Sequence, residues 1–301
     1  MGLTSVLLLV AALIPGIVLL SYVYKKDRAE KEPVGLLLLL LALGALSCLP
    51  ASLLEGILID NVLYNIFAPF GSVQGSGIYL SDGAYNVYLI LENFIGVALV
   101  EEGLKWMILY FVTRRNKNFN SLFDGLIYAV FVSLGFALLE NVLYVFNYGF
   151  EAAVLRAVTA VPGHMFDGVI MGYFYTLWRS SFLAHSLETY FMSKEKITVR
   201  MGEFKPKRLL ALSLVMPVLA HGFYDYCCSK DAWWSTSVFY IFLIALYVYC
   251  FSKIRELSKL DMPGAHYSVF WFTKTYPYLK EDVTEILGSR NNSSENSSAY
   301  N

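Results

Sequence analysis

Charged residues are scarce in this sequence: they make up 16% of its 301 residues, whereas hydrophobic residues make up 57%. Soluble globular domains usually carry charge on about a quarter of their residues. The shortage of charge therefore argues against a soluble protein. Several apolar runs also reach the roughly twenty residues that cross a bilayer as a helix. We predict an all-α, polytopic helical bundle in a membrane.

Several motifs of familiar proteases are missing as well. The four cysteines lie in apolar runs and lack the spacing of zinc ligands or of a disulfide framework, which indicates packing roles. No His-Glu-x-x-His is present, and no Gly-x-Ser-x-Gly elbow lies in a predicted span. The buried aspartates lack the Gly-x-Gly-Asp context of aspartyl intramembrane proteases. The net charge of −1 gives no indication of a nucleic-acid partner.

Seven segments are predicted to cross the membrane: 3–24, 33–54, 86–112, 122–147, 152–178, 209–230 and 233–253. They form a predicted membrane domain, 1–255, with a catalytic core at about 86–230. A cytoplasmic tail, 256–301, follows, and its low-complexity end from about 287 is predicted to be disordered. Residues 55–85 are predicted to be a long outer loop, more simply a flexible connector than a lid.

Lysine and arginine are distributed very unevenly between the predicted loops. The segments 25–32, 114–117, 179–208 and 253–301 carry 20 of the 23 basic residues, and the intervening loops carry almost none. Because basic residues concentrate on the cytoplasmic side of membrane proteins, we predict an outer N-terminus and a cytoplasmic C-terminus. The predicted location is a cell membrane that the chain crosses several times.

Ionisable side chains nevertheless occur inside four of the predicted spans, where each costs roughly 2.5–3.5 kcal/mol on insertion scales. They are Glu101, Glu102 and Lys105 on the third span, Glu140 and the polar Asn141 on the fourth, His164 and Asp167 on the fifth, and His221 and Asp225 on the sixth. At about 1.5 Å per helical residue, most lie roughly 20–25 Å from the basic ends of their spans. Their common depth predicts one shared polar site in the outer half of the membrane.

Spacing within the spans suggests which groups act together. Glu101 and Lys105 are four residues apart and can pair, which slightly favours Glu102 as the unpaired carboxylate; the choice of base between the two stays open. His221 and Asp225 are also four apart, so Asp225 can orient the imidazole. Arg156, a few residues into its span, is interpreted instead as an interfacial side chain.

Carboxylates and imidazoles without a nucleophile suit hydrolysis by an activated water. A glutamate takes a proton from water and later passes it to the leaving amine. A histidine, with Asn141 or Asp225 nearby, then stabilises the oxyanion. No cofactor is predicted, although three carboxylates and two histidines leave a divalent metal open as an alternative. A non-catalytic scaffold or a proton-linked transporter is the other alternative.

Four short motifs, in this order, resemble those of the PrsW family of intramembrane proteases, relatives of the type II CAAX prenyl endopeptidases. They are "EEGLK" (101–105), "FALLEN" (136–141), "PGH" (162–164) and "HGFYD" (221–225). The resemblance implies a glutamic-type protease with catalytic residues Glu101, Glu102, Glu140, His164, His221 and Asp225, supported by Lys105, Asn141 and Asp167. It also implies a single-pass membrane protein as substrate, with site-1 cleavage of an anti-sigma factor as one expected role. Glu140 stands where the CAAX enzymes carry histidine, so their substrate preference is not expected here.

Overall fold

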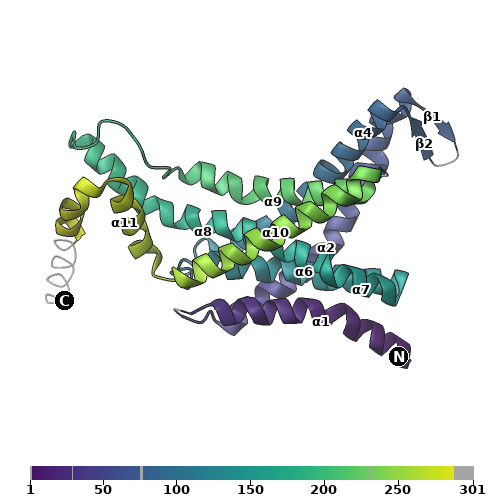
Figure 1. The fold of residues 1–301 in the computed structure, drawn as a ribbon, viewed down its shortest axis with the longest axis horizontal. Helices are drawn as coiled ribbons and strands as arrows, with labels where there is room; N and C mark the ends of the chain where they lie inside the picture. The colour runs from purple at the N-terminus through teal and green to yellow at the C-terminus, as the bar shows by residue number, and fades with distance from the viewer. Residues whose placement is uncertain (1, 29, 75–76, 231, 288–301) are drawn as a thin grey trace.

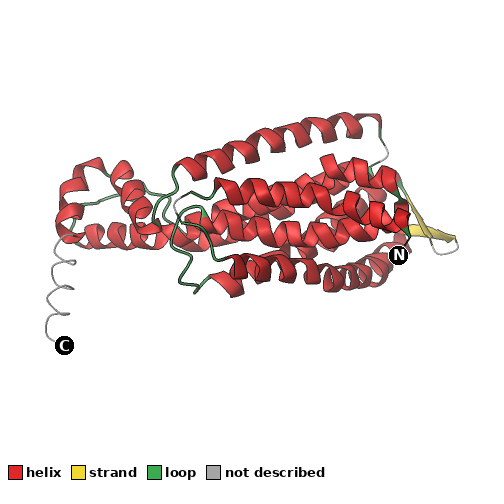
Figure 2. Cartoon of the chain, turned by 90° about the horizontal axis from the view of Figure 1, so that it is seen from below, coloured by secondary structure: helices red, strands yellow, loops and turns green. Residues whose placement is uncertain are grey.

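Long helices lie side by side along one axis of the computed structural model, which describes all residues except 1, 29, 75–76, 231 and 288–301 (Figure 1). Both ribbon views place the start of the first helix and a β-hairpin at one end of the bundle, here called the hairpin end (Figure 2). The opposite end holds α11 and is called the basic end. This arrangement confirms the predicted all-α membrane bundle.

The helices and strands follow in chain order. They are α1 (Leu3–Lys26), α2 (Val34–Gly56), the π-helical η1 (Ile57–Leu63), α3 (Tyr64–Phe67), the 3₁₀ turn η2 (Ala68–Phe70), β1 (Gly71–Gln74), β2 (Gly77–Leu80), α4 (Asp82–Leu91), the π-helical η3 (Glu92–Ala98), α5 (Leu99–Thr113), α6 (Asp124–Tyr148), α7 (Phe150–Val158), α8 (Ala160–Ser193), α9 (Pro206–Ser229), α10 (Trp233–Lys259), α11 (Gly264–Thr275) and η4 (Pro277–Leu279).

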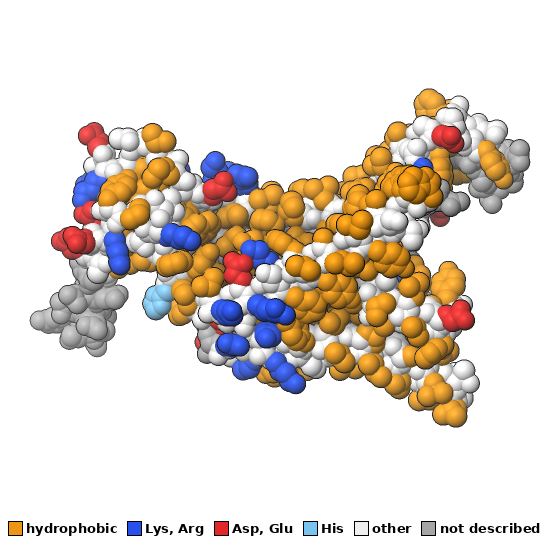
Figure 3. Space-filling view, viewed as in Figure 1, with side chains coloured by type: hydrophobic (Ala, Val, Ile, Leu, Met, Phe, Trp, Pro, Cys, Tyr) orange, Lys and Arg blue, Asp and Glu red, His pale blue; other side chains and the backbone are white. Residues whose placement is uncertain are grey.

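Helix α6 forms the centre of the bundle. Every residue from 124 to 137 is buried, as expected for a helix that is apolar on all sides and surrounded by other helices. Its neighbours include α1, α2, α5 and α8. Around this centre, hydrophobic side chains cover much of the visible surface of the bundle, whereas Lys and Arg gather towards the basic end (Figure 3). That surface suits a bilayer better than water.

Two glycines allow α2 and α6 to cross in direct backbone contact. A Cβ atom on Gly44 would lie 2.1 Å from the carbonyl oxygen of Val132, and one on Gly135 would lie 2.1 Å from that of Leu41. Small residues permit such close helix packing in membranes, where dispersion forces rather than the hydrophobic effect hold helices together. The crossing fixes α2 against the helix that carries Glu140.

Five helical stretches of the described chain are long and apolar enough to cross a membrane: Leu3–Lys26, Val34–Phe70, Asp124–Tyr148, Pro206–Ser229 and Trp233–Lys259. They match five of the predicted spans. The other two, 86–112 and 152–178, also lie in helices but are not among these five. The count of seven therefore stays a prediction.

The predicted span 152–178 is two helices rather than one. The backbone leaves helical geometry at Thr159 (φ −120°, ψ −79°), which separates α7 from α8. Pro162 and Gly163 lie just after this break, in the first turn of α8. A proline is tolerated there because first-turn N–H groups have no acceptor within the helix.

Residues 55–85 are also more ordered than the predicted connector. The helix begun by α2 continues through η1 and α3, and a return helix, α4, leads through η3 into α5. Between them, β1 pairs antiparallel with β2, from Gly71 opposite Leu80 to Gln74 opposite Gly77. These elements form an arm that projects from the hairpin end (Figure 1).

At the basic end, α8 continues well beyond its predicted span and packs against the tail. Phe191 on α8 and Phe272 on α11 stack at 5.7 Å between ring centroids. The Tyr276 hydroxyl donates to Glu188 (2.6 Å) and accepts the backbone N–H of Met201 (2.7 Å). The first part of the tail is thus folded against α8. The predicted disorder after about 287 falls almost entirely on residues outside those described.

Candidate active site

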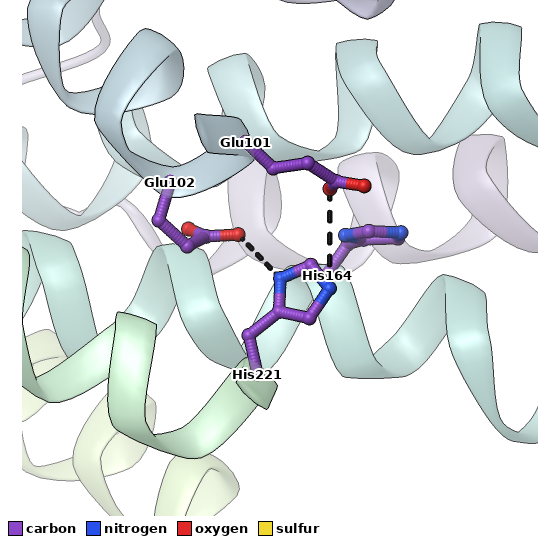
Figure 4. A group of neighbouring side chains, drawn as sticks. All are labelled: Glu101, Glu102, His164 and His221. Carbon is purple, nitrogen blue, oxygen red and sulfur yellow. Dashed lines mark hydrogen bonds and ion pairs between the residues drawn. The ribbon is translucent and has the colours of Figure 1, made fainter. Parts of the chain in front are cut away.

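The predicted polar residues come from four helices: α5 carries Glu101, Glu102 and Lys105, α6 carries Glu140 and Asn141, α8 carries His164 and Asp167, and α9 carries His221 and Asp225. Most of these side chains meet in one cluster, and Figure 4 shows four of them, Glu101, Glu102, His164 and His221, turned towards one another. The shared depth estimated from the sequence is consistent with these contacts.

Lys105 lies at the centre of the cluster and is fully buried. Its ammonium is 2.9 Å from Glu101 Oε2 and 2.8 Å from Glu102 Oε1. It is also 3.2 Å from His164 Nδ1 and 4.0 Å from the centre of the Phe136 ring. The expectation that Lys105 would leave Glu102 unpaired was therefore wrong. A flexible lysine stem reaches residues three and four positions away at once.

His221 has carboxylates at both ring nitrogens. Its Nδ1 lies 2.9 Å from Glu102 Oε1 and 3.7 Å from Asp167 Oδ2. Its Nε2 lies 3.1 Å from Asp225 Oδ2 and 3.9 Å from Glu101 Oε2. The contacts with Glu101 and Glu102 are the dashed lines in Figure 4. Carboxylates on both sides fix the plane of the ring and can accept an N–H from either nitrogen.

His164 connects this group to Glu140. An ammonium only donates hydrogen bonds, so His164 Nδ1 accepts from Lys105, and Nε2 donates to Glu140 Oε2 at 2.9 Å. Glu140 also accepts from Arg156 Nη2 at 2.6 Å. The interpretation of Arg156 as an interfacial side chain was wrong, because the break at Thr159 places it on a separate helix, α7, facing Glu140.

Asn141 lies behind the row formed by His164, Glu140 and Arg156 rather than within it. Its amide Nδ2 donates to the carbonyl of Ala12 on α1 (2.8 Å), and its Oδ1 accepts from Arg156 Nε (2.9 Å). The side chain therefore holds Arg156 in position. Both ends of the amide are engaged, so the geometry does not favour Asn141 as a donor to an oxyanion.

A cavity of about 800 Å³ opens beside the cluster. Its lining includes seven ionisable side chains of the cluster and its surroundings: Glu101, Glu140, Arg156, His164, Asp167, His221 and Asp225. The lining does not include Glu102 or Lys105. Of the two adjacent glutamates, Glu101 is thus the one that can meet a water molecule or a substrate, whereas Glu102 is fully buried behind it.

Local backbone geometry brings α5 and α9 together at this point. The π-helical η3 immediately precedes the glutamate pair, and such wide turns recur at functional sites. Gly222, next to His221, packs on the same segment: a Cβ atom there would lie 2.6 Å from Phe94 Cδ1 and 3.0 Å from its Cα. A larger residue at 222 would push His221 away from Glu102.

Known proteins with similar sequences were compared with this chain. The family model described as "PrsW family intramembrane metalloprotease" matches residues 32–251. The chain belongs to the PrsW family. It is 30% identical to the Protease PrsW of Geobacillus kaustophilus over 258 residues, covering 86% of this chain and 95% of the relative. It is 31% identical to the Protease PrsW of Bacillus subtilis over 254 residues, covering 84% and 96%. No solved structure matches.

Membership of the PrsW family confirms the resemblance drawn from the four motifs. It supports a protease embedded in a membrane with several spans, rather than the scaffold or transporter alternative. The match also reaches beyond the motifs into α2 and the projecting arm, which the motif resemblance did not cover.

The family description names a metalloprotease, so the donor set has to be compared with what a metal requires. Ligand atoms of Glu101, Glu102, His164 and His221 all lie within 4.8 Å of one another. One buried oxygen of Glu102, Oε2, has no hydrogen-bond partner among the residues that the structure describes. Two carboxylates and two imidazoles are suitable ligands by type.

The position of Lys105 argues against a metal in the cluster as it stands. Its ammonium contacts three of the four donors at 2.8–3.2 Å. A divalent ion held by these donors would lie next to that ammonium and be repelled by it, so Lys105 would have to move away before a metal could bind. The lysine already supplies the cation that these carboxylates need. The donor set does not fit a metal in this arrangement.

Proposed function

We propose that this protein is a glutamic-type intramembrane endopeptidase that hydrolyses a peptide bond of a single-pass membrane protein. One observation carries the proposal: Glu101 and His221 line the same cavity, with Glu101 Oε2 3.9 Å from His221 Nε2. From these positions both groups can reach a water molecule and a substrate carbonyl that lie beside them in the cavity. Family membership supports the protease activity itself.

In the proposed mechanism, the Glu101 carboxylate removes a proton from water, whose oxygen attacks the carbonyl carbon of the scissile bond. The His221 N–H donates to the resulting oxyanion, in competition with Asp225. Glu101 then gives its proton to the leaving amine as the C–N bond breaks. Lys105 forms an ion pair with Glu101, and Glu102 orients His221 through Nδ1.

The other polar residues are proposed to position this pair. Asp167 and Asp225 hold the imidazole from the remaining directions. His164, Glu140 and Arg156 form a bonded row that closes one wall of the cavity.

We also propose the orientation predicted from the basic residues, with the N-terminus outside and the C-terminus in the cytoplasm. In that orientation the cavity, whose lining includes Tyr148 and Ser229 at the ends of α6 and α9, lies towards the outer side.

The experiment is a co-expression screen. Wild-type protein and the Glu101→Gln variant are produced with a panel of single-pass proteins that carry a tag at their cytoplasmic N-terminus, including anti-sigma factors. The proposal predicts a shortened, tagged product only with the wild type. Cleavage from the outer side leaves the span in this product, so it stays in the membrane fraction. No product from any panel member, or the same product with Glu101→Gln, would contradict the proposal.

A metal-dependent hydrolase is the second candidate, favoured by the four-donor group and by the family description. We expect cleavage by the purified protein to persist after dialysis against EDTA or 1,10-phenanthroline, because Lys105 already neutralises the carboxylates. Loss of activity on chelation, with recovery on addition of Zn²⁺ or Fe²⁺ and not of Mg²⁺, would establish the metal-dependent enzyme instead.

A further inference from the structure

Glu55 is a carboxylate of the cavity wall that no part of the proposed mechanism uses. It lies near the end of α2, and Cys48, Ser52 and Glu55 share one face of that helix and line the cavity together. Glu55 Oε1 is buried and has no hydrogen-bond partner among the described residues. The other carboxylates of the wall differ, because each lies beside a cationic or imidazole side chain.

Packing of α2 against α5 shows the depth at which Glu55 lies. The two helices run in opposite directions, and the cluster of Cys48 and Ala51 packs against Val100 and Leu104. About two turns further along this helical stretch, towards the hairpin end, Ile59 lies against Gly96, where a Cβ atom would be 3.1 Å from Ile59 Cγ1. Glu55, between Ala51 and Ile59, is therefore level with the start of α5, where Glu101 lies.

The cavity thus holds an excess of negative charge at the level of the proposed base. Its lining includes Glu55, Glu101, Glu140, Asp167 and Asp225. Arg156 and the two imidazoles face the last four of these carboxylates. Glu55 is left facing a cavity large enough for a peptide segment. An ionised carboxylate at membrane depth needs a partner, and none of the described side chains provides one.

We infer that Glu55 forms a specificity subsite for a lysine or arginine side chain of the substrate, close to the scissile bond. This inference rests on the proposed protease function and adds a substrate class to it. A basic residue inside a transmembrane segment is itself costly to bury. Pairing with Glu55 offsets the cost of burying the basic side chain and the cost of burying the carboxylate. A substrate with a neutral residue at that position leaves Glu55 unpaired.

The test uses purified full-length protein in detergent micelles and a peptide library, prepared with a protease that leaves Lys and Arg inside the peptides. Products are identified by mass spectrometry. With the wild type, Lys or Arg is expected to be enriched at one fixed position near the cleaved bond. With Glu55→Gln, kcat/KM for those basic peptides is expected to fall about 10- to 100-fold, the range for losing a hydrogen bond to a charged group. Peptides with a neutral residue there should be unaffected.

Two further variants complete the design. Asp60→Asn is the matched control, since Asp60 is an exposed acid five residues further along the same helical stretch and does not line the cavity. It should keep the wild-type preference. Glu55→Lys should invert the preference, so that Asp or Glu becomes enriched at the same position.

The outcomes separate this inference from the proposed function. If the wild type releases no more products than Glu101→Gln, the protease proposal itself fails. If the wild type cleaves without a basic preference, or Glu55→Gln keeps that preference, the subsite is overturned. An equal loss of kcat for all peptides in Glu55→Gln would instead make Glu55 a proton donor in the reaction and would likewise overturn the subsite.

Discussion

Replacement of Glu101 by glutamine is expected to lower kcat/KM for any cleaved substrate by about 10²- to 10⁴-fold, the usual contribution of a general base. The amide cannot accept a proton from water at neutral pH. The fold should survive, because Lys105 keeps its contact with Glu102 at 2.8 Å. The measurement is initial rates with purified variants, together with Tm from intrinsic fluorescence to show that the variant is folded.

The comparison with Glu102→Gln decides which glutamate is the base. Glu102 does not line the cavity, so its replacement should act through His221, which loses the carboxylate at Nδ1. A smaller fall in rate and a clear fall in Tm are expected. Glu92→Gln is the control, since that carboxylate lies earlier on the same helical run, away from the cavity. Normal turnover by Glu101→Gln, with an inactive Glu102→Gln, would reverse the assignment.

Much of this site could be predicted from the sequence, because buried charge in a membrane has few explanations. The depth of Glu101, His164 and His221 depends only on helical rise and on the basic residues that mark the span ends. Both quantities can be read without coordinates. The motifs then predicted the protease family.

The choice between Glu101 and Glu102 could not be predicted in the same way. The two side chains differ by about 100° around the helix, but which direction faces a cavity depends on how α2, α6 and α9 pack around α5. Spacing allowed Lys105 to reach Glu101 four residues away and Glu102 three residues away, and only the first of these pairs was predicted.

Arg156 and Glu55 were missed for a common reason: the predicted spans had the wrong ends. Hydropathy joined 152–178 into one helix, so Arg156 was placed near a membrane surface, whereas the break at Thr159 turns it towards Glu140. The span 33–54 stopped one residue before Glu55, although the apolar pattern continues through η1 and α3. The apolar pattern beyond residue 54 was the signal that could have placed Glu55 inside a span. An acidic residue within an apolar run of such length is as anomalous as Glu101.

Lys105→Met should destabilise the protein more than any other single change at the site. Methionine preserves the length of the side chain and removes its charge, which leaves Glu101 and Glu102 buried, adjacent and without their shared cation. Breaking a buried ion pair from one side typically costs about 3–5 kcal/mol. A large fall in Tm, or loss of folded protein during purification, is therefore expected. Lys117→Met, at an exposed lysine, should leave Tm unchanged.

A double variant distinguishes loss of charge balance from loss of packing. Glu102→Gln with Lys105→Met removes one negative and one positive charge together, so the remaining net charge of the cluster equals that of the wild type. If Lys105 acts chiefly as the buried counter-ion, the double variant should be more stable than Lys105→Met alone, with a favourable coupling of at least about 1 kcal/mol. If both variants unfold at the same temperature, Lys105 stabilises the bundle through its packing on Phe136 and His164 instead.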